Sequence, residues 1–281
     1  MNALYDIPAP AKLNLFLHVT GRREDGYHLL QSVFMLIDWC DTLHFEQRSD
    51  GLIQRHDLDT PLPADDLIVR AARLLQQSTG TACGADISVH KRIPAQAGMG
   101  GGSSDAASTL LSLNRLWNLN LPLSRLATLG LQLGADVPFF LHGRNAWVEG
   151  VGEKITPLDL PPADFWVVKP DAGVETASIF RHPALERATK PATIAVFAAD
   201  PYGFGQNDLQ PVASLLCPDV RKVIDFFESN RLQARMTGSG SAVFAHCTEE
   251  NAAIQVPDHW IARRCSNLEV HPLQGWAPSD N

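Results

Sequence analysis

The segment PAQAGMGGGSSDAAS, residues 94–108, has four glycines among the five residues 98–102. Glycine at this density suits neither a helix interior nor a strand interior, because each glycine loses backbone entropy on folding and adds no packing. It does allow the main chain to approach a ligand closely. Polar and apolar residues alternate over residues 87–93, and apolar residues recur at helical spacing from Ala106 to Trp117. The pattern therefore predicts a strand, a glycine loop and a helix that begins near Ser103 and Ser104.

A glycine loop that leads into a helix is typical of an anion-binding site. The first N–H groups of a helix have no partner within it, and the helix dipole adds partial positive charge, so both features suit a phosphate. Ser103 and Ser104 could cap the helix, or donate their hydroxyls to a phosphate or to its metal ion. A flexible glycine-rich linker is the alternative, but linkers rarely pass directly into an apolar-striped helix.

Two common phosphate loops do not fit this segment. The P-loop has a lysine and then Ser or Thr after its last glycine, whereas Gly102 is followed by Ser103 and Ser104. The dinucleotide fingerprint has Gly or Ala at the position of Ser103. A dinucleotide-dependent oxidoreductase is therefore disfavoured.

The segment instead resembles the phosphate-binding motif of the GHMP small-molecule kinases. PAKLNL at residues 10–15 resembles the first motif of that family, and MTGSGSAVF at residues 236–244 resembles its third. The three motifs follow one another in the family's order over most of the chain. The resemblance implies ATP as phosphoryl donor, Mg²⁺ as its ion, and an α+β fold of two lobes. The first lobe would be like ribosomal protein S5, and the second would be a ferredoxin-like α/β sandwich.

The boundary between the two lobes is predicted from prolines. Pro157, Pro161 and Pro162 interrupt the chain before a strand predicted over residues 165–169. Domain boundaries fall in such segments. We therefore predict an N-terminal ATP-binding domain over residues 1–157 and a C-terminal substrate-side domain over residues 158–281.

The resemblance implies that the glycine loop and its neighbours bind ATP. The residues implied are Lys91, Pro94, Ala95, Gln96, Ala97, Gly98, Met99, Gly100, Gly101, Gly102, Ser103, Ser104 and Asp66. Asp66 begins a helix predicted up to Gly80, and helix capping explains this aspartate equally well. The net charge is −8, so ATP would approach against the overall field and local donors would have to bind it.

Lys12 and Asn14 are predicted to project from the same side of one strand. Alternation over residues 10–21 predicts a strand with Leu13, Leu15, Leu17 and Val19 on one face and Lys12, Asn14, Phe16 and His18 on the other. A lysine at a strand start is usually solvated. The resemblance instead implies that Lys12 is the cation of the active site.

Asp136 lies in the segment LGADVPFF, residues 133–140. We predict a preceding helix that Ser124 caps and Gly134 ends. Val137 precedes a proline and is expected to leave the helical region, which holds Asp136 on a constrained turn. The pattern alone predicts a turn aspartate, whereas the resemblance implies a catalytic base with Lys12 as its cation. No residue is predicted as a metal ligand.

The loop GRREDGYH, residues 21–28, resembles a segment found in one branch of the GHMP family. There a tyrosine stacks on a cytosine and a histidine hydrogen-bonds to its edge, which suits a flat base. The substrate-binding residues implied are Asn14, Tyr27, His28, Thr176, Phe180, Gly238 and Ser239, with Phe180 across the ring from Tyr27. Ordinary packing is the alternative for the aromatic residues, and a plain hairpin turn is the alternative for residues 237–241.

This branch phosphorylates the 2-hydroxyl of a cytidine-diphosphate-linked 2-C-methylerythritol in the non-mevalonate route to isoprenoids. The resemblance implies the same reaction here, with ADP as second product. Another GHMP kinase, for homoserine, mevalonate or a sugar, is the first alternative. A nucleotide-binding module without catalysis is the second, and the presence of both Lys12 and Asp136 argues against it.

Composition narrows the class of protein further. There is no run of about 18 apolar residues, and the first residues lack a basic segment followed by an apolar one. Five scattered cysteines without a C-x-x-C pair favour free thiols in a reducing compartment. The negative net charge disfavours nucleic acid and anionic membranes as partners. We expect a cytoplasmic enzyme for a small molecule, monomeric or weakly dimeric, whose last ten residues fray.

Overall fold

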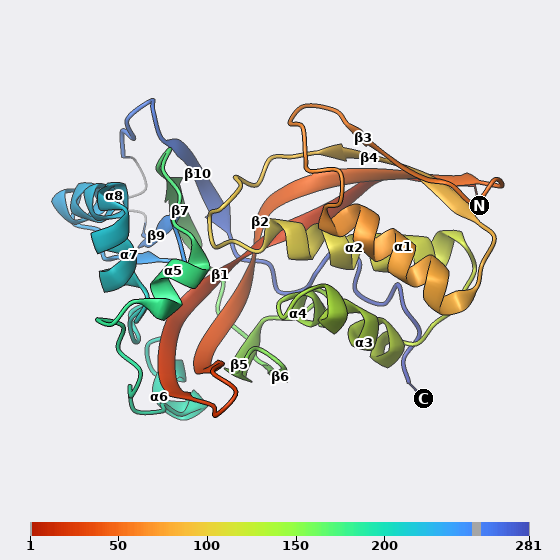
Figure 1. Ribbon diagram of the computed structural model, residues 1–281. Coiled ribbons are helices and arrows are strands. Elements are labelled where there is room, and N and C mark those ends of the chain that lie inside the picture. The colour runs from red at the N-terminus through yellow and green to blue at the C-terminus, as the bar shows by residue number, and fades with distance from the viewer. Residues whose placement is uncertain (1, 249–253, 281) are drawn as a thin grey trace.

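The computed structural model describes residues 2–248 and 254–280 and has two lobes, each built on one β-sheet (Figure 1). A long hairpin joins them. Its strands are β1 (Ala3–Arg22) and β2 (His28–Arg48), which pair antiparallel along nearly their whole length. Among the described residues, no helix has the length and apolar character needed to cross a membrane. The cytoplasmic location and the oligomeric state remain predictions.

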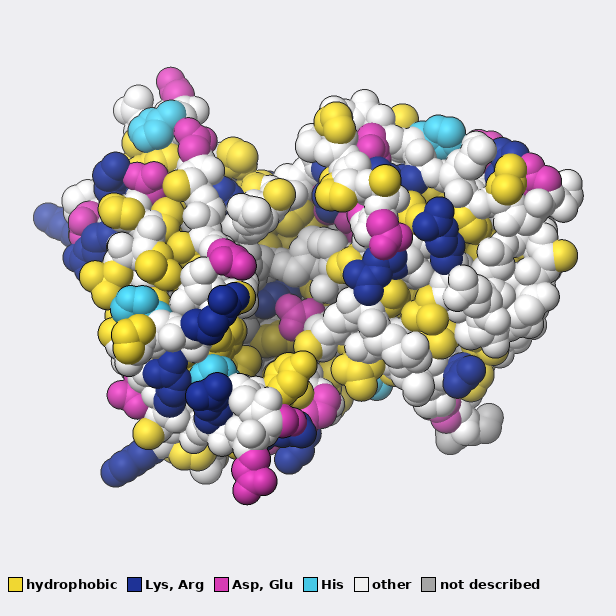
Figure 2. Space-filling model, viewed as in Figure 1, with side chains coloured by type: hydrophobic (Ala, Val, Ile, Leu, Met, Phe, Trp, Pro, Cys, Tyr) yellow, Lys and Arg dark blue, Asp and Glu magenta, His cyan; other side chains and the backbone are white. Residues whose placement is uncertain are grey.

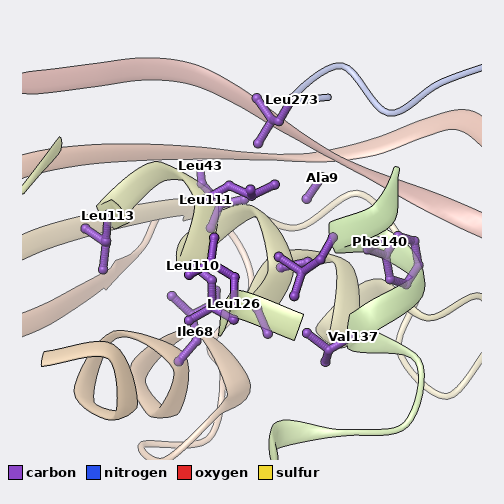
Figure 3. Packing of buried hydrophobic residues seen from close by; sticks show 14 of the residues in the cluster. Ala9, Leu43, Ile68, Leu110, Leu111, Leu113, Leu126, Val137, Phe140 and Leu273 are labelled. Carbon is purple, nitrogen blue, oxygen red and sulfur yellow. The ribbon is translucent and has the colours of Figure 1, made fainter. Parts of the chain in front are cut away.

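The first lobe is a six-stranded sheet with helices on one face. Strand order is β3-β4-β2-β5-β6, with β1 paired to β2; the further strands are β3 (Ile53–Asp57), β4 (Gly84–His90), β5 (Ala146–Gly150) and β6 (Lys154–Pro157). The helices are α1 (Leu67–Thr79), α2 (Gly101–Leu116), α3 (Leu123–Leu133) and α4 (Val137–His142). Leu43 of the sheet, Leu110 of α2 and Leu126 of α3 are fully buried in one apolar cluster (Figure 3). This packing fixes the start of α2, which follows the glycine loop.

The second lobe is a four-stranded antiparallel sheet in the order β10-β7-β9-β8. Its strands are β7 (Asp164–Lys169), β8 (Ala234–Met236), β9 (Val243–Cys247) and β10 (Ile261–Ser266). Counted within the lobe this is 4-1-3-2, the order of a ferredoxin-like sheet. The lobe also contains α5 (Thr176–Arg181), α6 (Ile194–Ala198), α7 (Gln210–Leu216) and α8 (Pro218–Ser229). The predicted two-lobe α+β class is confirmed.

The two lobes share an apolar core. One face of the second sheet packs under α7 and α8, where Val243 meets Val212 and Phe227. The opposite face, with Phe165 and Phe244, packs against residues of β1, β2 and β5. The lobes are therefore in contact through buried side chains.

The alternation predicted for β1 is wrong from residue 16 onward. The pairing of β1 with β2 shifts register between Asn14 and Leu17. Phe16 consequently joins Leu13 in the shared core, while Leu17 turns to the side of Lys12 and lines the same pocket. A bulge adds one residue to a strand and so exchanges the two faces beyond it.

The chain end returns to the first lobe. Leu268 donates its N–H to the carbonyl of Leu36 at 2.9 Å, and Leu273 is buried in the first lobe's core (Figures 1 and 3). Asp280 accepts hydrogen bonds from the N–H and hydroxyl of Ser124 at 3.3 and 2.6 Å. The expected fraying of the last ten residues is wrong for those that the structure describes. The sheets change between Pro157 and Asp164, but the domain boundary itself stays a prediction.

Helix starts differ from expectation at two places. α3 begins at Leu123 with Pro122 as N-cap, so Ser124 lies within its first turn, where Asp280 is its partner. Val137 begins α4 instead of leaving the helical region. Pro138 stands in the first turn of α4, where the missing N–H costs no helical hydrogen bond.

Candidate active site

Backbone hydrogen bonds bring the three predicted motifs together. Lys12 donates its N–H to the carbonyl of Met99 at 2.9 Å, which ties the first motif to the glycine loop. Ser241 donates its N–H to the carbonyl of Gln96 at 3.0 Å, which ties the third motif to the same loop. Asn14 donates its N–H to Oγ1 of Thr237 at 2.9 Å and closes the triangle. Segments far apart in the chain thus form one site.

The glycine loop depends on a residue without Cβ at Gly98. Its φ is +73°, and a Cβ there would lie 2.2 Å from the carbonyl oxygen of Thr237. Gly100, with φ of +72°, is the N-cap of α2, and no side chain caps this helix. The first backbone N–H bonded within the helix is that of Ser104, to the carbonyl of Gly100. The N–H groups of residues 101–103 are therefore left to a ligand.

A groove of 970 Å³ lies along this loop and is called the nucleotide groove. Every predicted ATP-binding residue except Ser104 lines it. Ser104 is fully buried, and its Oγ has no hydrogen-bond partner. Because α2 begins at Gly101, the Ser104 side chain falls on the buried face of the helix, while Ser103 lines the groove.

Asp66 lines the nucleotide groove but already has partners. Its carboxylate accepts the N–H of Val69 at 3.1 Å, as an N-cap of α1, and pairs with Arg55 at 2.7 Å. Gly80 ends α1 in the left-handed conformation. The capping interpretation of Asp66 is confirmed, and its contact with a nucleotide stays a prediction.

Lys91 is held by two buried carboxylates. Its Nζ pairs with Asp41 and lies 2.5 Å from Oδ2 of Asp105. Burial raises the pKa of Asp105 to about 8, the charge of Lys91 opposes that rise, and the charge of Asp41 adds to it. Although burial works against the charged ammonium, Asp105 and Asp41 raise the pKa of Lys91. Lys91 therefore stays charged, but its charge is compensated within the protein.

Lys12 and Asp136, 124 positions apart in the chain, lie side by side. Nζ of Lys12 is 3.6 Å from Oδ2 of Asp136, and the lysine side chain is 4% exposed while that of Asp136 is 32% exposed. Nζ also donates to Oδ1 of Asn14 and lies 4.5 Å from the ring centre of Phe34. Burial lowers the pKa of Lys12, and the negative charge of Asp136 opposes that lowering. A half-exposed carboxylate thus faces a fixed, buried cation.

The orientation of both side chains has a local cause. Asn14 donates its amide to Oγ of Ser32 at 2.9 Å, so its carbonyl is turned towards Lys12. Asp136 is the N-cap of α4, yet its side chain makes no capping hydrogen bond. Its carboxylate is therefore free to meet Lys12 and a ligand. The N-terminus of a helix also favours negative charge.

A smaller cavity of 270 Å³, called the Lys12 pocket, contains this pair. It shares part of its wall with the nucleotide groove, and Thr176 and Ser239 bridge that wall through a 2.6 Å hydroxyl contact. The predicted substrate-binding residues that line it are Asn14, Thr176, Phe180, Gly238 and Ser239. Figure 2 shows the hollow between the two lobes in which these cavities lie.

A third cavity of 670 Å³, called the Tyr27 pocket, adjoins the Lys12 pocket at Leu30, Val151 and Phe180. Tyr27 is 65% exposed at its mouth. His28 lies against Phe180, with ring centres 4.9 Å apart and planes inclined by 34°. Burial, followed by the charges of Arg187 and Arg22, lowers the pKa of His28. The three cavities thus form one continuous cleft, with Lys12 and Asp136 in its middle section.

Several residues of the site had no signal in the sequence. Asp41 and Asp105 enclose Lys91, and Arg187 donates to His28 at 3.2 Å. The partners are separated by many residues, so no local pattern joins them. Asp105 stands in the segment that resembles a phosphate loop, but nothing in that segment predicts its pairing with Lys91.

Comparison with known proteins agrees with this geometry. Residues 66–144 match the GHMP kinases N terminal domain, and residues 194–267 match GHMP kinases C terminal. The chain belongs to the GHMP kinase family and is an ATP-using small-molecule kinase.

Its curated relatives narrow the place within the family. The 4-diphosphocytidyl-2-C-methyl-D-erythritol kinase of Delftia acidovorans (strain DSM 14801 / SPH-1) is 64% identical over 286 residues, with 100% of both chains covered. That of Variovorax paradoxus (strain S110) is 61% identical over 295 residues, with 99% of this chain and 100% of the relative covered. A crystal structure of 4-(cytidine 5'-diphospho)-2C-methyl-D-erythritol kinase is 36% identical, with a TM-score of 0.78 and coverage of 92% and 98%. Within the GHMP family, the chain therefore groups with the 4-diphosphocytidyl-2-C-methyl-D-erythritol kinases.

Proposed function

We propose that this chain transfers the γ-phosphoryl group of ATP to the 2-hydroxyl of 4-diphosphocytidyl-2-C-methyl-D-erythritol, giving the 2-phosphate and ADP, in the non-mevalonate route to isoprenoids. The observation that carries the proposal is the position of Lys12 and Asp136 between two cavities of different character. One cavity is a glycine-lined groove at a helix N-terminus, and the other is a pocket with aromatic and histidine side chains. The names of the close relatives supply the substrate.

Asp136 accepts the proton of the 2-hydroxyl. The hydroxyl oxygen then forms a bond to the γ-phosphorus, and the bond from that phosphorus to the β–γ bridging oxygen breaks, so ADP leaves. Phosphoryl transfer asks the protein mainly to align the groups and to neutralise charge. The Nζ of Lys12, 3.6 Å from Asp136, holds the attacking oxygen near the carboxylate and stabilises charge on the transferred group.

The nucleotide groove fits a triphosphate. The N–H groups of residues 101–103 are unpaired among the described residues, and Gly98 lets the loop lie against the third motif. These groups bind phosphate oxygens without bringing a counter-charge that would have to be desolvated. Lys91 contributes less than a free lysine, because Asp41 compensates its charge.

Mg²⁺ would enter with the phosphates. No group of three or more acidic, histidine or cysteine side chains able to hold a metal occurs among the described residues. Mg²⁺ needs no such cage, since it is bound mainly by phosphates, water and one or two side chains. Ser103, which lines the groove at the first turn of α2, would hold it through its hydroxyl. The ion would supply neutralisation of phosphate charge.

The cytidine would occupy the Tyr27 pocket. Tyr27 and Phe180 supply aromatic faces, and His28 supplies a polar edge at the same place. Stacking of a base on an aromatic side chain contributes about 1–3 kcal/mol. Thr176, Ser239 and Gly238 would contact the diphosphate and the methylerythritol in the Lys12 pocket.

The test is an assay with Mg-ATP and 4-diphosphocytidyl-2-C-methyl-D-erythritol, followed by phosphorus NMR of the products. The expected result is ADP together with one new phosphate monoester signal. Homoserine, mevalonate and galactose, offered separately under the same conditions, should give neither. Transfer to one of these alcohols, with none to the cytidyl alcohol, would overturn the proposal.

A further inference from the structure

Arg187 lies in the Tyr27 pocket and has no part in the proposed transfer. It follows α5 in the chain and is half-buried. Its Nη2 donates to the carbonyl oxygens of Phe180 and His182 at 3.0 and 2.9 Å, and its Nη1 donates to that of Leu185 at 2.9 Å. Three carbonyls from one short segment therefore fix the guanidinium plane.

The Nε–H group of Arg187 donates a hydrogen bond to His28. Nε of Arg187 lies 3.2 Å from Nε2 of His28. Every N–H of a guanidinium is a donor, so Nε2 of His28 must be the acceptor. A histidine that accepts through Nε2 is neutral and has its proton on Nδ1.

The surroundings of His28 favour the neutral ring. Burial and the charges of Arg187 and Arg22 all lower its pKa, while Asp25 and Arg181 are the other charged side chains that line the pocket. Within residues 2–248 and 254–280, the hydrogen bond of the His28 ring is the one from Arg187 to Nε2, which leaves Nδ1 to a ligand. The pocket therefore offers a ligand an N–H donor at this ring.

We infer that Arg187 is a positioning residue: by occupying Nε2 it fixes the Nδ1–H tautomer of His28, the histidine that the resemblance places at the cytosine edge, and so sets the preference of this site for cytosine over uracil. The inference rests on the proposed function, because it assigns the base selectivity of the same site. Cytosine has an unprotonated N3 and accepts such a hydrogen bond. Uracil carries a hydrogen on N3. Its N3–H and the Nδ1–H of His28 would then be two donors that face each other without an acceptor. A buried donor without an acceptor is costly, so the discrimination is against uracil.

The guanidinium of Arg187 also positions Phe180, an aromatic residue that lines the Tyr27 pocket. Arg187 binds the carbonyl of Phe180, whose ring lies 4.9 Å from that of His28. His28 begins β2 and Phe180 lies in α5, so one side chain ties the two elements that line the pocket. Replacement of Arg187 should therefore change the tautomer of His28, while the rings of His28 and Phe180 both remain in the pocket.

The tautomer is tested by nitrogen NMR on the full chain labelled with ¹⁵N-histidine. His28→Gln identifies the signals of His28. In the wild type, we expect a protonated Nδ1 and an unprotonated Nε2 at neutral pH. In Arg187→Met, Nε2 should become protonated in a large part of the population, and the pKa of His28 should rise. Arg181→Met makes the same charge change beside the pocket, has no contact with His28, and should leave the tautomer as in the wild type.

The selectivity is tested by calorimetric titration with CDP and with UDP. The wild type should bind CDP at least about tenfold more tightly than UDP, since one such contact discriminates bases by this order. Arg187→Met should reduce the preference to within about threefold, and Arg181→Met should keep it. Arg187→Lys retains a donor and should recover part of the preference for CDP. This recovery would show that the preference lost in Arg187→Met is not lost through misfolding.

The inference is overturned if Arg187→Met retains the Nδ1–H form, or if it retains the wild-type ratio of CDP to UDP affinity. Equal binding of CDP and UDP by the wild type also overturns it. The proposed function fails by a separate result: no transfer of phosphate to the cytidyl alcohol by a protein that shows the expected tautomer and preference.

Discussion

Asp136 is exposed enough to receive a proton from a ligand, while Lys12 beside it is almost completely buried. This difference in exposure suits their roles. The lysine is held by Asn14 and Phe34 and cannot follow the substrate, so it gives a fixed charge. A fixed charge costs no reorganisation when the transition state forms.

Asp136→Asn should lower kcat by about 10²–10⁴, the usual contribution of a general base. KM for both substrates should change little, because the amide keeps the shape of the carboxylate. Steady-state assays of ADP release measure both constants. Asp159→Asn, at an exposed surface carboxylate, is the control and should behave as the wild type. A kcat near the wild-type value in Asp136→Asn would remove Asp136 from the mechanism.

Asp105 gives a prediction for the dependence of stability on pH. Its pKa in the folded protein, about 8, is above the ordinary carboxyl value of about 4. Between these values the folded state binds more protons than the unfolded state, so its contribution to stability falls as pH rises through that window.

The melting temperature of the wild type should therefore fall as the pH rises from 5 to 8, and Asp105→Asn should make this fall smaller. At pH 8 the variant should be more stable than the wild type, because only the wild type then has to ionise a buried carboxyl group, while Lys91 keeps Asp41 as its partner in both proteins. Thermal unfolding without nucleotide is the measurement. Asp219→Asn, at an exposed pair on α8, should keep the wild-type slope. The same slope in Asp105→Asn would show that Asp105 is ionised in the folded protein.

At the scale of elements, the glycine loop works because it can lie against the turn before β9. Two glycines with similar positive φ allow a matched comparison. A Cβ at Gly98 would lie 2.2 Å from the carbonyl oxygen of Thr237, whereas a Cβ at Gly80 would meet nothing within 4 Å. The conformational penalty of the left-handed region, about 1–2 kcal/mol, is common to both.

Gly98→Ala should weaken ATP binding at least about tenfold, because the loop must move away from the third motif to make room. Gly80→Ala should lower stability by about 1–2 kcal/mol and leave ATP affinity unchanged. Calorimetric titration with an ATP analogue and thermal unfolding give the two quantities. Equal ATP affinities for the two variants would mean that contact between the motifs does not shape the groove.

The sequence predicted which helices, strands and loops surround the site better than it predicted which side chains lie on each face of a strand. The glycine loop, the helix after it and the neighbourhood of Lys12 and Asp136 followed from local pattern and from motif resemblance. The exchange of faces in β1 did not, since alternation assumes constant register and a bulge changes it without a local signal. The pairs Lys91–Asp41 and Arg187–His28 join residues distant in sequence, and only the folded chain brings them together.

At the scale of the whole molecule, the apolar core shared by the lobes should make unfolding cooperative. Phe165 and Phe244 of the second sheet pack with β1 and β2 of the first. Unfolding of the second lobe would expose this surface on the first lobe. Neither lobe should therefore retain its structure when the other is lost.

Phe227→Ala tests this coupling from a site away from the shared core. Phe227 is a fully buried residue of α8 in the second lobe, and its truncation should cost about 3–5 kcal/mol. Scanning calorimetry should show one transition in both proteins, shifted as a whole to lower temperature in the variant. Two transitions, of which only one moves, would show that the lobes unfold independently.

The return of the chain end to the first lobe affects how the protein is made. Leu273 completes the core of that lobe, and Asp280 supplies the acceptor at the start of α3. During translation, these positions stay unfilled until residues 268–280 have been synthesised and have emerged from the ribosome. A nascent polypeptide arrested before residue 268 would thus display an unsealed apolar surface to chaperones, although all of its glycine loop had already been synthesised.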